Sequence, residues 1–112
     1  MIVRIWRGQV ATAENVERYH RHVTENVLPE LAGIAGHRGA YLLRRETASG
    51  GGGTEFLVVT LWDSIESVRA FAGDRVEGAV VEPEAKAVLS DFDDFVRHYE
   101  VAHGQPPCGE SR

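Results

Sequence analysis

Four stretches of the chain have the patterns that predict β-strands, either alternating apolar and polar residues or a short, nearly continuous apolar run. These stretches are residues 2–8, 39–45, 55–62 and 95–101. Between and after them, apolar residues recur at helical spacing in residues 13–31, 65–73 and 83–90. The order of the main elements is β-α-β-β-α-β. We therefore predict an α+β fold of the ferredoxin-like type, with helices on one face of a four-stranded antiparallel sheet.

The first helical segment carries an apolar stripe that includes one histidine. Thr12 precedes the segment as a potential N-cap. The stripe consists of Val16, His20, Val23, Val27 and Leu31, with Tyr19 beside it. Pro29 interrupts the stripe, so we expect either a kink or a break at which Pro29 begins a short second helix.

Residues 55–62 are nearly apolar on both faces of the predicted strand. A sheet with one face in water would alternate there, so this strand must be covered on both sides. The chain has helices enough for one side, and a second copy is the most economical cover for the other. We therefore expect a homodimer in which two sheets stack as a dimeric α+β barrel.

Length and composition fit one small acidic domain. The chain has 112 residues and a net charge of −5, which argues against general affinity for nucleic acid or anionic lipid. We expect a domain over residues 1–102, a glycine-rich loop at Gly50–Gly53, and a disordered tail over 103–112 that holds the single cysteine, Cys108. The N-terminal residues lack the features of a signal peptide, and no apolar stretch is long enough to span a membrane. We therefore expect a cytoplasmic protein without a membrane partner.

A resemblance to a known family rests on three segments and on the end of the last strand. The segments are residues 1–8 (MIVRIWRG), 36–45 (GHRGAYLLRR) and 56–73, which runs from FLVVTLWDS to the helix end RAFAG. Together they resemble the antibiotic biosynthesis monooxygenase family, and the closing residues 98–101 (HYEV) resemble one branch of it. The resemblance covers about residues 2–102.

The resemblance implies a homodimeric α+β barrel with a pocket between each sheet and its helices. Some members of the family oxygenate aromatic polyketides without metal or flavin, and others bind and degrade haem. Members of known activity carry a Trp on the second helix, where this chain has Phe71. The haem-degrading members carry an axial His where this chain has Val81, and an Asn on the first strand where it has Trp6 or Arg7. The resemblance thus favours a reaction without a cofactor over haem chemistry.

Two histidines are candidates for a catalytic base, because an imidazole titrates near neutral pH. His20 lies on the apolar stripe and would face the sheet, either as a base or as a hydrogen-bonded core residue. His98 lies within the last strand, where it would line the pocket or the dimer interface. His22 is two residues from His20, so the pair points in different directions and we expect His22 to face solvent.

The candidate substrate-binding residues combine one cation with several aromatic rings. Arg4 and Trp6 share a face of the first strand, where they could hold a planar anion by charge and stacking. The alternative is that Arg4 pairs with a carboxylate while Trp6 packs at an interface. Further ring-bearing candidates for a pocket wall, or simply for the core, are Tyr19, Tyr41, Trp62 and Phe71.

We predict no metal site, because the calcium-loop pattern around Asp91, Asp93 and Asp94 lacks its other ligands. We expect these residues to form a solvated acidic loop.

Two main hypotheses about function follow. The first is a small monooxygenase that needs no cofactor and acts on a hydrophobic, phenol-like or polyketide-like aromatic substrate. The second is a dimer without chemistry, which binds a small ligand or is purely structural. A cavity of ~300 Å³ or more would favour the first, and a packed interior the second.

Overall fold

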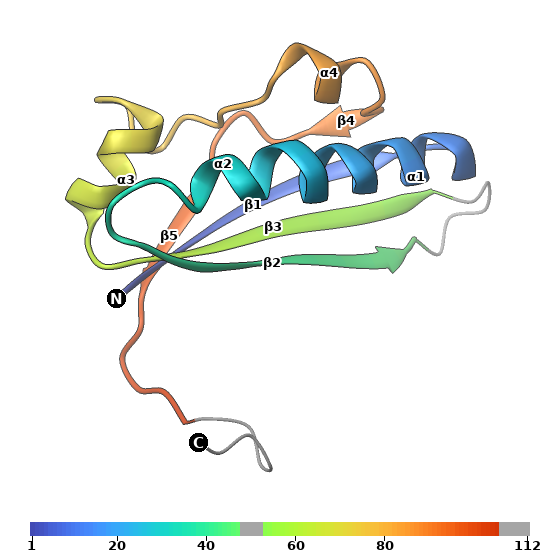
Figure 1. Ribbon diagram of the computed structural model, residues 1–112. Helices are drawn as coiled ribbons and strands as arrows, with labels where there is room; N and C mark the ends of the chain where they lie inside the picture. The colour runs from blue at the N-terminus through green and yellow to red at the C-terminus, as the bar shows by residue number, and fades with distance from the viewer. Residues whose placement is uncertain (48–52, 106–112) are drawn as a thin grey trace.

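The computed structural model describes residues 1–47 and 53–105, which form one antiparallel sheet with the helices on one of its faces (Figure 1). The strands are β1 (Ile2–Val10), β2 (His37–Glu46), β3 (Thr54–Trp62), β4 (Asp91–Phe92) and β5 (Arg97–Glu100). The helices are α1 (Ala13–His22), the π-helical η1 (Val23–Val27), α2 (Leu28–Leu31), α3 (Ile65–Ala72) and α4 (Pro83–Lys86). The predicted loop Gly50–Gly53 and the predicted tail lie largely outside the described residues, and so does Cys108.

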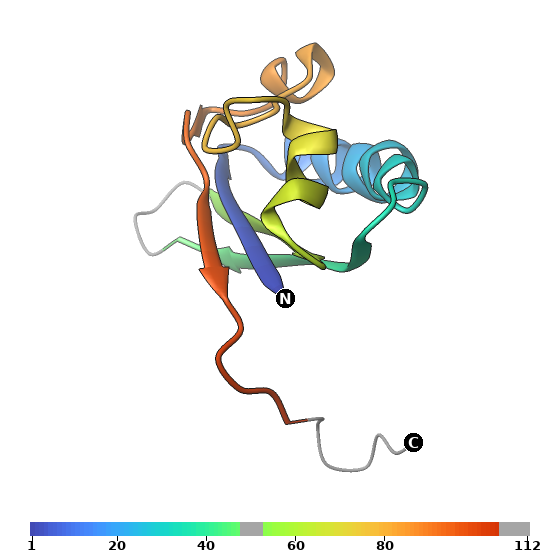
Figure 2. The same ribbon diagram turned by 90° about the vertical axis from the view of Figure 1, so that its left-hand side faces the viewer.

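The sheet has the strand order of the ferredoxin-like fold, which confirms the predicted fold class. β2, β3 and β1 are neighbours in that order, and β5 and β4 pair along the remaining edge of β1. β5 pairs with the first half of β1 and β4 with the second half. Figure 2 shows the layered arrangement from the side, with the helices gathered on one face of the sheet. Within the described residues, no helix is long and apolar enough to cross a membrane.

The last strand is shorter than the predicted range 95–101, and the predicted acidic loop begins inside a strand. Between β4 and β5 the chain leaves the edge of β1 and attaches to the segment that follows α3. The amide of Ala79 donates to the carbonyl of Asp94 (2.9 Å), and the amide of Val96 donates to the carbonyl of Glu77 (2.8 Å). Residues 94–96 are therefore bonded to the segment after α3 instead of to β1.

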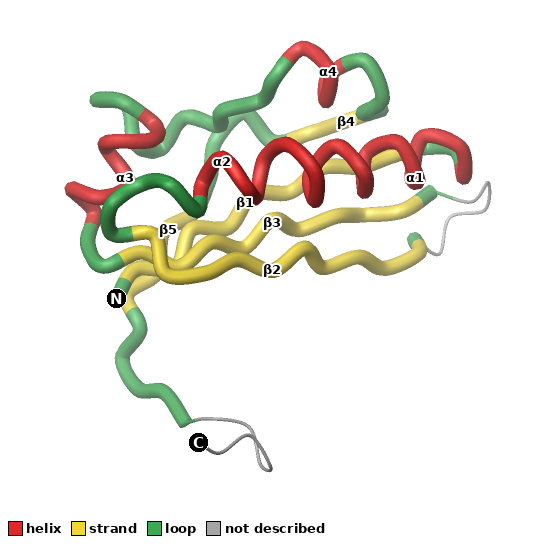
Figure 3. The backbone as a smooth tube through the Cα atoms, in the orientation of Figure 1, coloured by secondary structure: helices red, strands yellow, loops and turns green. Residues whose placement is uncertain are grey.

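The elements α1, η1 and α2 follow one another without a gap, and the backbone trace in Figure 3 shows them as one continuous helical segment. The π-helical turn η1 comes before the segment that holds Pro29. Thr12 is the N-cap, as predicted, and its hydroxyl accepts from the amide of Asn15 at 3.2 Å. The amide of Leu28 donates to the carbonyl of Val23, five residues back, and Pro29 stands in the first turn of α2. The predicted short helix is present as α2, but it begins at Leu28 and follows η1 directly, so the predicted break at Pro29 is not observed.

The predicted second and third helices are shortened at their C-terminal ends. α3 ends at Ala72 because Gly73 adopts a φ of 82°, which terminates the helix. The helix predicted over 83–90 ends at Lys86, and the chain then turns so that the amide of Ser90 reaches the carbonyl of Gln9 at 2.8 Å. This bond ties the end of the α4 segment to β1.

The two faces of the sheet have different surroundings. Even-numbered residues of β1 face the helices, and their partners on β3 include Phe56 and Trp62, which are fully buried. The opposite face has no covering element among the described residues. It is apolar across four strands, with Val3, Ile5, Tyr41, Leu43, Leu57, Val59, Leu61 and Tyr99. Tyr41 and Tyr99 on this face are 60% and 51% exposed.

Candidate functional site

A cavity of about 110 Å³ lies between the sheet and the helices. Its floor comes from β1 and β3, with Arg4, Trp6, Val58 and Thr60. Its walls come from the α1–η1–α2 segment, from Phe71 of α3 and from the segment around residues 80–85. The lining is mostly apolar. The volume of the cavity is smaller than the ~300 Å³ at which typical ligand pockets begin. The cavity thus falls short of the volume expected to favour an enzyme, and it limits a ligand to a small molecule.

Arg4 brings a buried positive charge to this cavity. Its side chain lies on the helix-facing side of β1, and the residue is 5% exposed. Nη1 donates to the carbonyl of Val76 (2.6 Å) and Nη2 to the carbonyl of Gly78 (3.0 Å). Nη1 also lies 3.0 Å from Nε2 of His98. A guanidinium has five N–H groups, so two of them have no protein partner among the described residues.

The charge of Arg4 lacks a carboxylate partner. None of the ion pairs among the described residues includes it, so the predicted alternative of a carboxylate pair is not observed. Burial lowers the pKa of Arg4 to about 10, which still leaves the guanidinium charged at neutral pH. Its Cζ lies 5.6 Å from the ring centre of Phe71, a cation–π distance. A buried charge without a counter-ion is costly, so an anion bound in the cavity would stabilise Arg4.

His98 lies behind Arg4 and does not line the cavity. The two residues face each other across β1 and β5, and Nε2 of His98 must accept because a guanidinium can only donate. Burial, followed by the positive charge of Arg4, lowers the pKa of His98. Its free lone pair is thus used to hold Arg4, which leaves it unsuited to removing a substrate proton.

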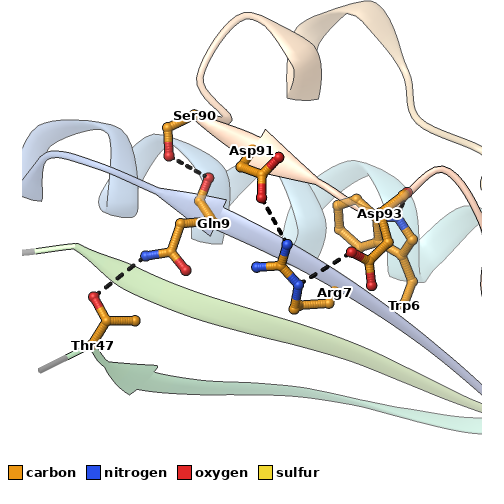
Figure 4. Close-up of polar contacts among 7 residues, drawn as sticks. All are labelled: Trp6, Arg7, Gln9, Thr47, Ser90, Asp91 and Asp93. Carbon is orange, nitrogen blue, oxygen red and sulfur yellow. Dashed lines mark hydrogen bonds and ion pairs between the residues drawn. The ribbon is translucent and has the colours of Figure 1, made fainter. Parts of the chain in front are cut away.

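Trp6 belongs to the floor of the cavity, and a hydrogen bond to a residue outside the cavity fixes its ring. Its indole Nε1 donates to the carbonyl of Asp93 at 2.8 Å, in the segment after β4 (Figure 4). Arg7, on the opposite face, pairs with Asp91 (2.8 Å) and Asp93 (3.2 Å). The predicted acidic residues are exposed to solvent, as expected, and Asp91 and Asp93 also pair with Arg7, which connects this segment to β1.

Tyr19 lies on the buried face of α1 and lines the cavity at 3% exposure. Its ring is 6.4 Å from that of Trp6 and 4.9 Å from that of Phe56, measured between centroids. Burial raises the pKa of Tyr19, because an anionic phenolate would lose its hydration. Tyr19 therefore stays neutral and contributes a ring and a hydroxyl to the wall.

The structure reverses the predicted positions of the two helical histidines relative to the cavity and the solvent. His20 is exposed and takes no part in the cavity. His22, expected to face solvent, lines the cavity, and its side chain is 11% exposed. The reason is the segment around residues 80–85, which covers the side of α1 that carries His22. That segment has no periodic pattern, so the sequence did not show which side it would cover.

Two of the predicted aromatic residues also lie elsewhere. Trp62 is fully buried but belongs to the core, where its ring packs 6.0 Å from Phe71 and its Nε1 donates to Thr60 (2.8 Å). Tyr41 lies on the uncovered face of the sheet, because it pairs with Val59 rather than with a helix-facing residue. Of the predicted substrate-binding residues, the cavity brings together Arg4, Trp6, Tyr19 and Phe71.

Sequence reasoning missed a polar pair at the cavity. Nε2 of His22 lies 3.1 Å from Oε1 of Glu82, and both residues line the cavity. The carboxylate is off the axis of the ring nitrogen, so the contact is a close charge–dipole pair rather than an aligned hydrogen bond. Asn26 contacts the other ring nitrogen of His22 through its Nδ2 (3.2 Å). The spacing of four residues between His22 and Asn26 was the available signal.

The residues of the cavity do not fit a haem group. The position that the resemblance matched to an axial histidine is Val81, and this apolar side chain lines the cavity. Nε2 of His22, the one ring nitrogen near the cavity wall, is enclosed by protein atoms. Within the described residues, no cluster of three or more His, Cys, Asp or Glu side chains could hold a metal ion.

Solved structures of several proteins share this fold. One is a protein of Deinococcus radiodurans classed with the antibiotic biosynthesis monooxygenases, at 17% identity, a TM-score of 0.59, and 97% and 100% coverage of this chain and that one. The haem-degrading MhuD of Mycobacterium tuberculosis, solved with two haems, matches at 19% identity, TM-score 0.62, and 95% and 100% coverage. The monooxygenase ActVA-Orf6 of Streptomyces coelicolor, solved with nanaomycin D, matches at 15% identity, TM-score 0.61, and 95% and 91% coverage.

At these identities the structural matches show the fold alone. A search among curated proteins finds no match. The family model of the antibiotic biosynthesis monooxygenases matches residues 1–88. This match spans most of the 112 residues, so the chain belongs to the antibiotic biosynthesis monooxygenase family.

Proposed function

We propose that this protein is a monooxygenase that uses no cofactor and acts on a small aromatic substrate with an acidic hydroxyl group. The observation that carries the proposal is Arg4, a buried cation without a carboxylate partner, at the floor of a cavity lined by aromatic rings. Family membership supports it, as does the shared fold with a monooxygenase solved with the ligand nanaomycin D. The cavity volume favours one or two rings over a complete polyketide.

In the proposed reaction the substrate itself supplies the electrons for oxygen. Loss of the hydroxyl proton leaves a phenolate, and Arg4 stabilises its negative oxygen in a dry site. The phenolate is electron-rich at the ring carbon opposite the oxygen, and a C–O bond to O2 forms there. Cleavage of the O–O bond, with loss of the hydrogen on that carbon, releases water and gives a quinone. For a naphthol the balance is naphthol plus O2 to naphthoquinone plus water.

Each cavity residue has a defined part in this proposal. Arg4 holds the substrate oxygen, and Trp6 and Phe71 hold the planar ring between them. Tyr19 supplies a neutral wall that does not repel the anion. His98 acts as a positioning residue, because it fixes the guanidinium of Arg4 at 3.0 Å from its Nε2.

We propose that the functional unit is a homodimer in which the uncovered sheet face meets the same face of a second copy. The face is apolar on β1, β2, β3 and β5, and an apolar area of this extent is unfavourable in water. Two stacked sheets would enclose Val59 and its neighbours in a second core. Since the cavity lies on the opposite face, each copy would keep its own site.

A ligand-binding protein without chemistry is the second candidate function. The small cavity volume and the presence of Phe71, where active members of the family carry a Trp, favour it. Haem chemistry is less favoured, because Val81 lines the cavity.

Metal-free protein, incubated with 1-naphthol in air and under nitrogen, separates these functions. A monooxygenase forms naphthoquinone and consumes oxygen only in air. A binding protein gives saturable quenching of tryptophan fluorescence by 1-naphthol with no product. A Soret shift on titration with haemin would favour the haem alternative.

A further inference from the structure

The cavity contains a carboxylate whose side chain serves no structural purpose in its own helix. Glu82 is the N-cap residue of α4, yet its side chain makes no capping hydrogen bond. The side chain is 40% exposed and lines the cavity, with Oε1 at 3.1 Å from Nε2 of His22. The carboxylate of Glu82 is therefore open to a ligand and lies in close polar contact with a largely buried histidine.

The other titratable groups at the cavity are poor proton acceptors. Arg4 is a cation and Tyr19 is a neutral phenol. His22 has one ring nitrogen in contact with Asn26, and its Nε2 is enclosed by protein atoms. His98 accepts from Arg4 and lies outside the cavity lining.

Glu30 is the second carboxylate in the lining, but its side chain lacks the polar contact that the side chain of Glu82 makes. It is exposed on α2, and its side chain has no hydrogen bond or ion pair among the described residues. A base must keep a fixed geometry toward the proton it removes, and a partner that restrains the side chain provides this. Glu82 has such a partner in His22.

We infer that Glu82 is the proton acceptor of this cavity and that His22 is its positioning residue. The O–H bond of the bound hydroxyl breaks, and its proton passes to a carboxylate oxygen of Glu82. The electron pair stays on the substrate oxygen, which faces the guanidinium of Arg4. No oxidant takes part in this step. The inference rests on the proposed function only for the identity of the reaction that follows.

His22 also connects the cavity to the outside of the molecule. A second, polar hollow of about 210 Å³ lies outside α1, and His22 is the residue that lines both spaces. The carboxylate of Glu82 thus lies beside a side chain that extends toward solvent. The charged residues around this outer hollow are Arg18, Arg21, Glu25 and Glu84.

The excited-state behaviour of bound 2-naphthol tests the inference without oxygen. Excited 2-naphthol is a strong acid that transfers its proton to a nearby acceptor, and the resulting naphtholate emits at longer wavelength. We expect the bound probe to emit mainly as naphtholate in the unaltered protein. In Glu82→Gln, at matched occupancy, the rate of proton transfer should fall about 100-fold. Glu84→Gln removes the same charge two residues away, outside the cavity, and should leave the rate unchanged.

Variants of His22 test its positioning role. His22→Gln keeps an N–H donor beside Glu82 and should retain most of the naphtholate emission. His22→Leu removes the donor and should lower the transfer rate while the affinity for 2-naphthol stays within a few-fold. Equal loss in both variants would contradict positioning by the polar N–H group beside Glu82.

The outcomes separate this inference from the proposed function. Unchanged transfer in Glu82→Gln, or a loss that follows Glu30→Gln instead, overturns the inference while the monooxygenase proposal stands. Rapid transfer that depends on Glu82, without any oxygen consumption, supports the inference and contradicts the monooxygenase. Failure of 2-naphthol to bind contradicts both.

Discussion

Arg4 and His98 face each other across two paired strands, with Nη1 of the arginine 3.0 Å from Nε2 of the histidine. The arginine can only donate, so the contact requires a neutral imidazole. The carbonyls of Val76 and Gly78 hold the other side of the guanidinium. Protonation of His98 would turn an attractive contact into the repulsion of two buried cations. The charge at the cavity floor is thus coupled to pH through a residue that does not touch the cavity.

We expect acid to destabilise the protein partly through His98. Burial and the charge of Arg4 lower the pKa of His98 in the folded state. As the pH falls, His98 takes up a proton at a higher pH in the unfolded chain than in the folded protein. The contribution of neutral His98 to the free energy of unfolding is therefore fully present above its ordinary pKa of about 6.5. It is lost as the pH falls from there through the lowered pKa. Thermal unfolding from pH 8 down to about pH 4.5 should show this loss in the unaltered protein.

The variant His98→Gln isolates that contribution, because glutamine can still accept from Arg4 through its oxygen but does not titrate. The fall in unfolding midpoint with acid should become shallower. His37, whose pKa burial also lowers, remains in both proteins and cancels in the comparison. Superimposable pH dependences would show that His98 is not coupled to Arg4 in this way.

Arg4 should discriminate between anionic and neutral ligands of the same shape. In Arg4→Gln we expect the affinity for 2-naphthoate to fall about 10- to 100-fold, the loss of roughly 1.5–3 kcal/mol for a hydrogen bond to a charged group. The affinity for neutral 2-naphthylmethanol should change little. Fluorescence titration measures both, with Arg18→Gln, on the exposed side of α1, as the charge-matched control. An equal loss for both ligands would assign Arg4 a structural role only.

Gly8 should control the position of Trp6 in the cavity wall. A Cβ atom at Gly8 would lie 2.7 Å from the Trp6 ring, which is too close, and 3.0 Å from Leu89, which is a tight contact. Gly8→Ala should displace the ring, weaken naphthol binding, and lower the free energy of unfolding by about 1–3 kcal/mol. Gly33→Ala is the matched control, because its added atom meets ordinary contact at 3.7 Å. Unchanged binding in Gly8→Ala would place the ligand away from Trp6.

A charge in the middle of the uncovered sheet face should separate the proposed dimer. Val59 pairs with Ile5 on one side and Tyr41 on the other, so Val59→Glu would bury a carboxylate between two sheets. Sedimentation should give a dimer for the unaltered protein at micromolar concentration and a monomer for Val59→Glu. Thr24→Glu adds the same charge to an exposed helix position and should remain a dimer. A monomeric unaltered protein would contradict the proposed assembly.

Strand patterns predicted the cavity floor well, and for a simple reason. A period of two fixes which residues share a face, so Arg4 and Trp6 were placed together before their surroundings were known. The same period placed Tyr41 and Leu43 on one face but could not tell which face, because both faces of that strand carry apolar residues. Pairing with Val59 decides it.

Helical patterns predicted the site less well. The helical spacing placed His20 on the apolar stripe and His22 off it, but the segment around residues 80–85 covers the side of α1 that carries His22. Residues 74–82 have neither a helical nor a strand period, so their path was not predictable from pattern. The contact between His22 and Glu82, far apart in sequence, depends on that path.

The incorporation of isotopically heavy O2 tests the central claim most directly. Metal-free protein is incubated with 1-naphthol under heavy O2 in ordinary water, and the mass of the naphthoquinone product is measured by mass spectrometry. We expect one heavy oxygen atom per product molecule, with the second oxygen retained from the naphthol hydroxyl, and a much lower yield from Arg4→Gln. The absence of product, or a product whose new oxygen comes from water, would contradict the assignment as a monooxygenase.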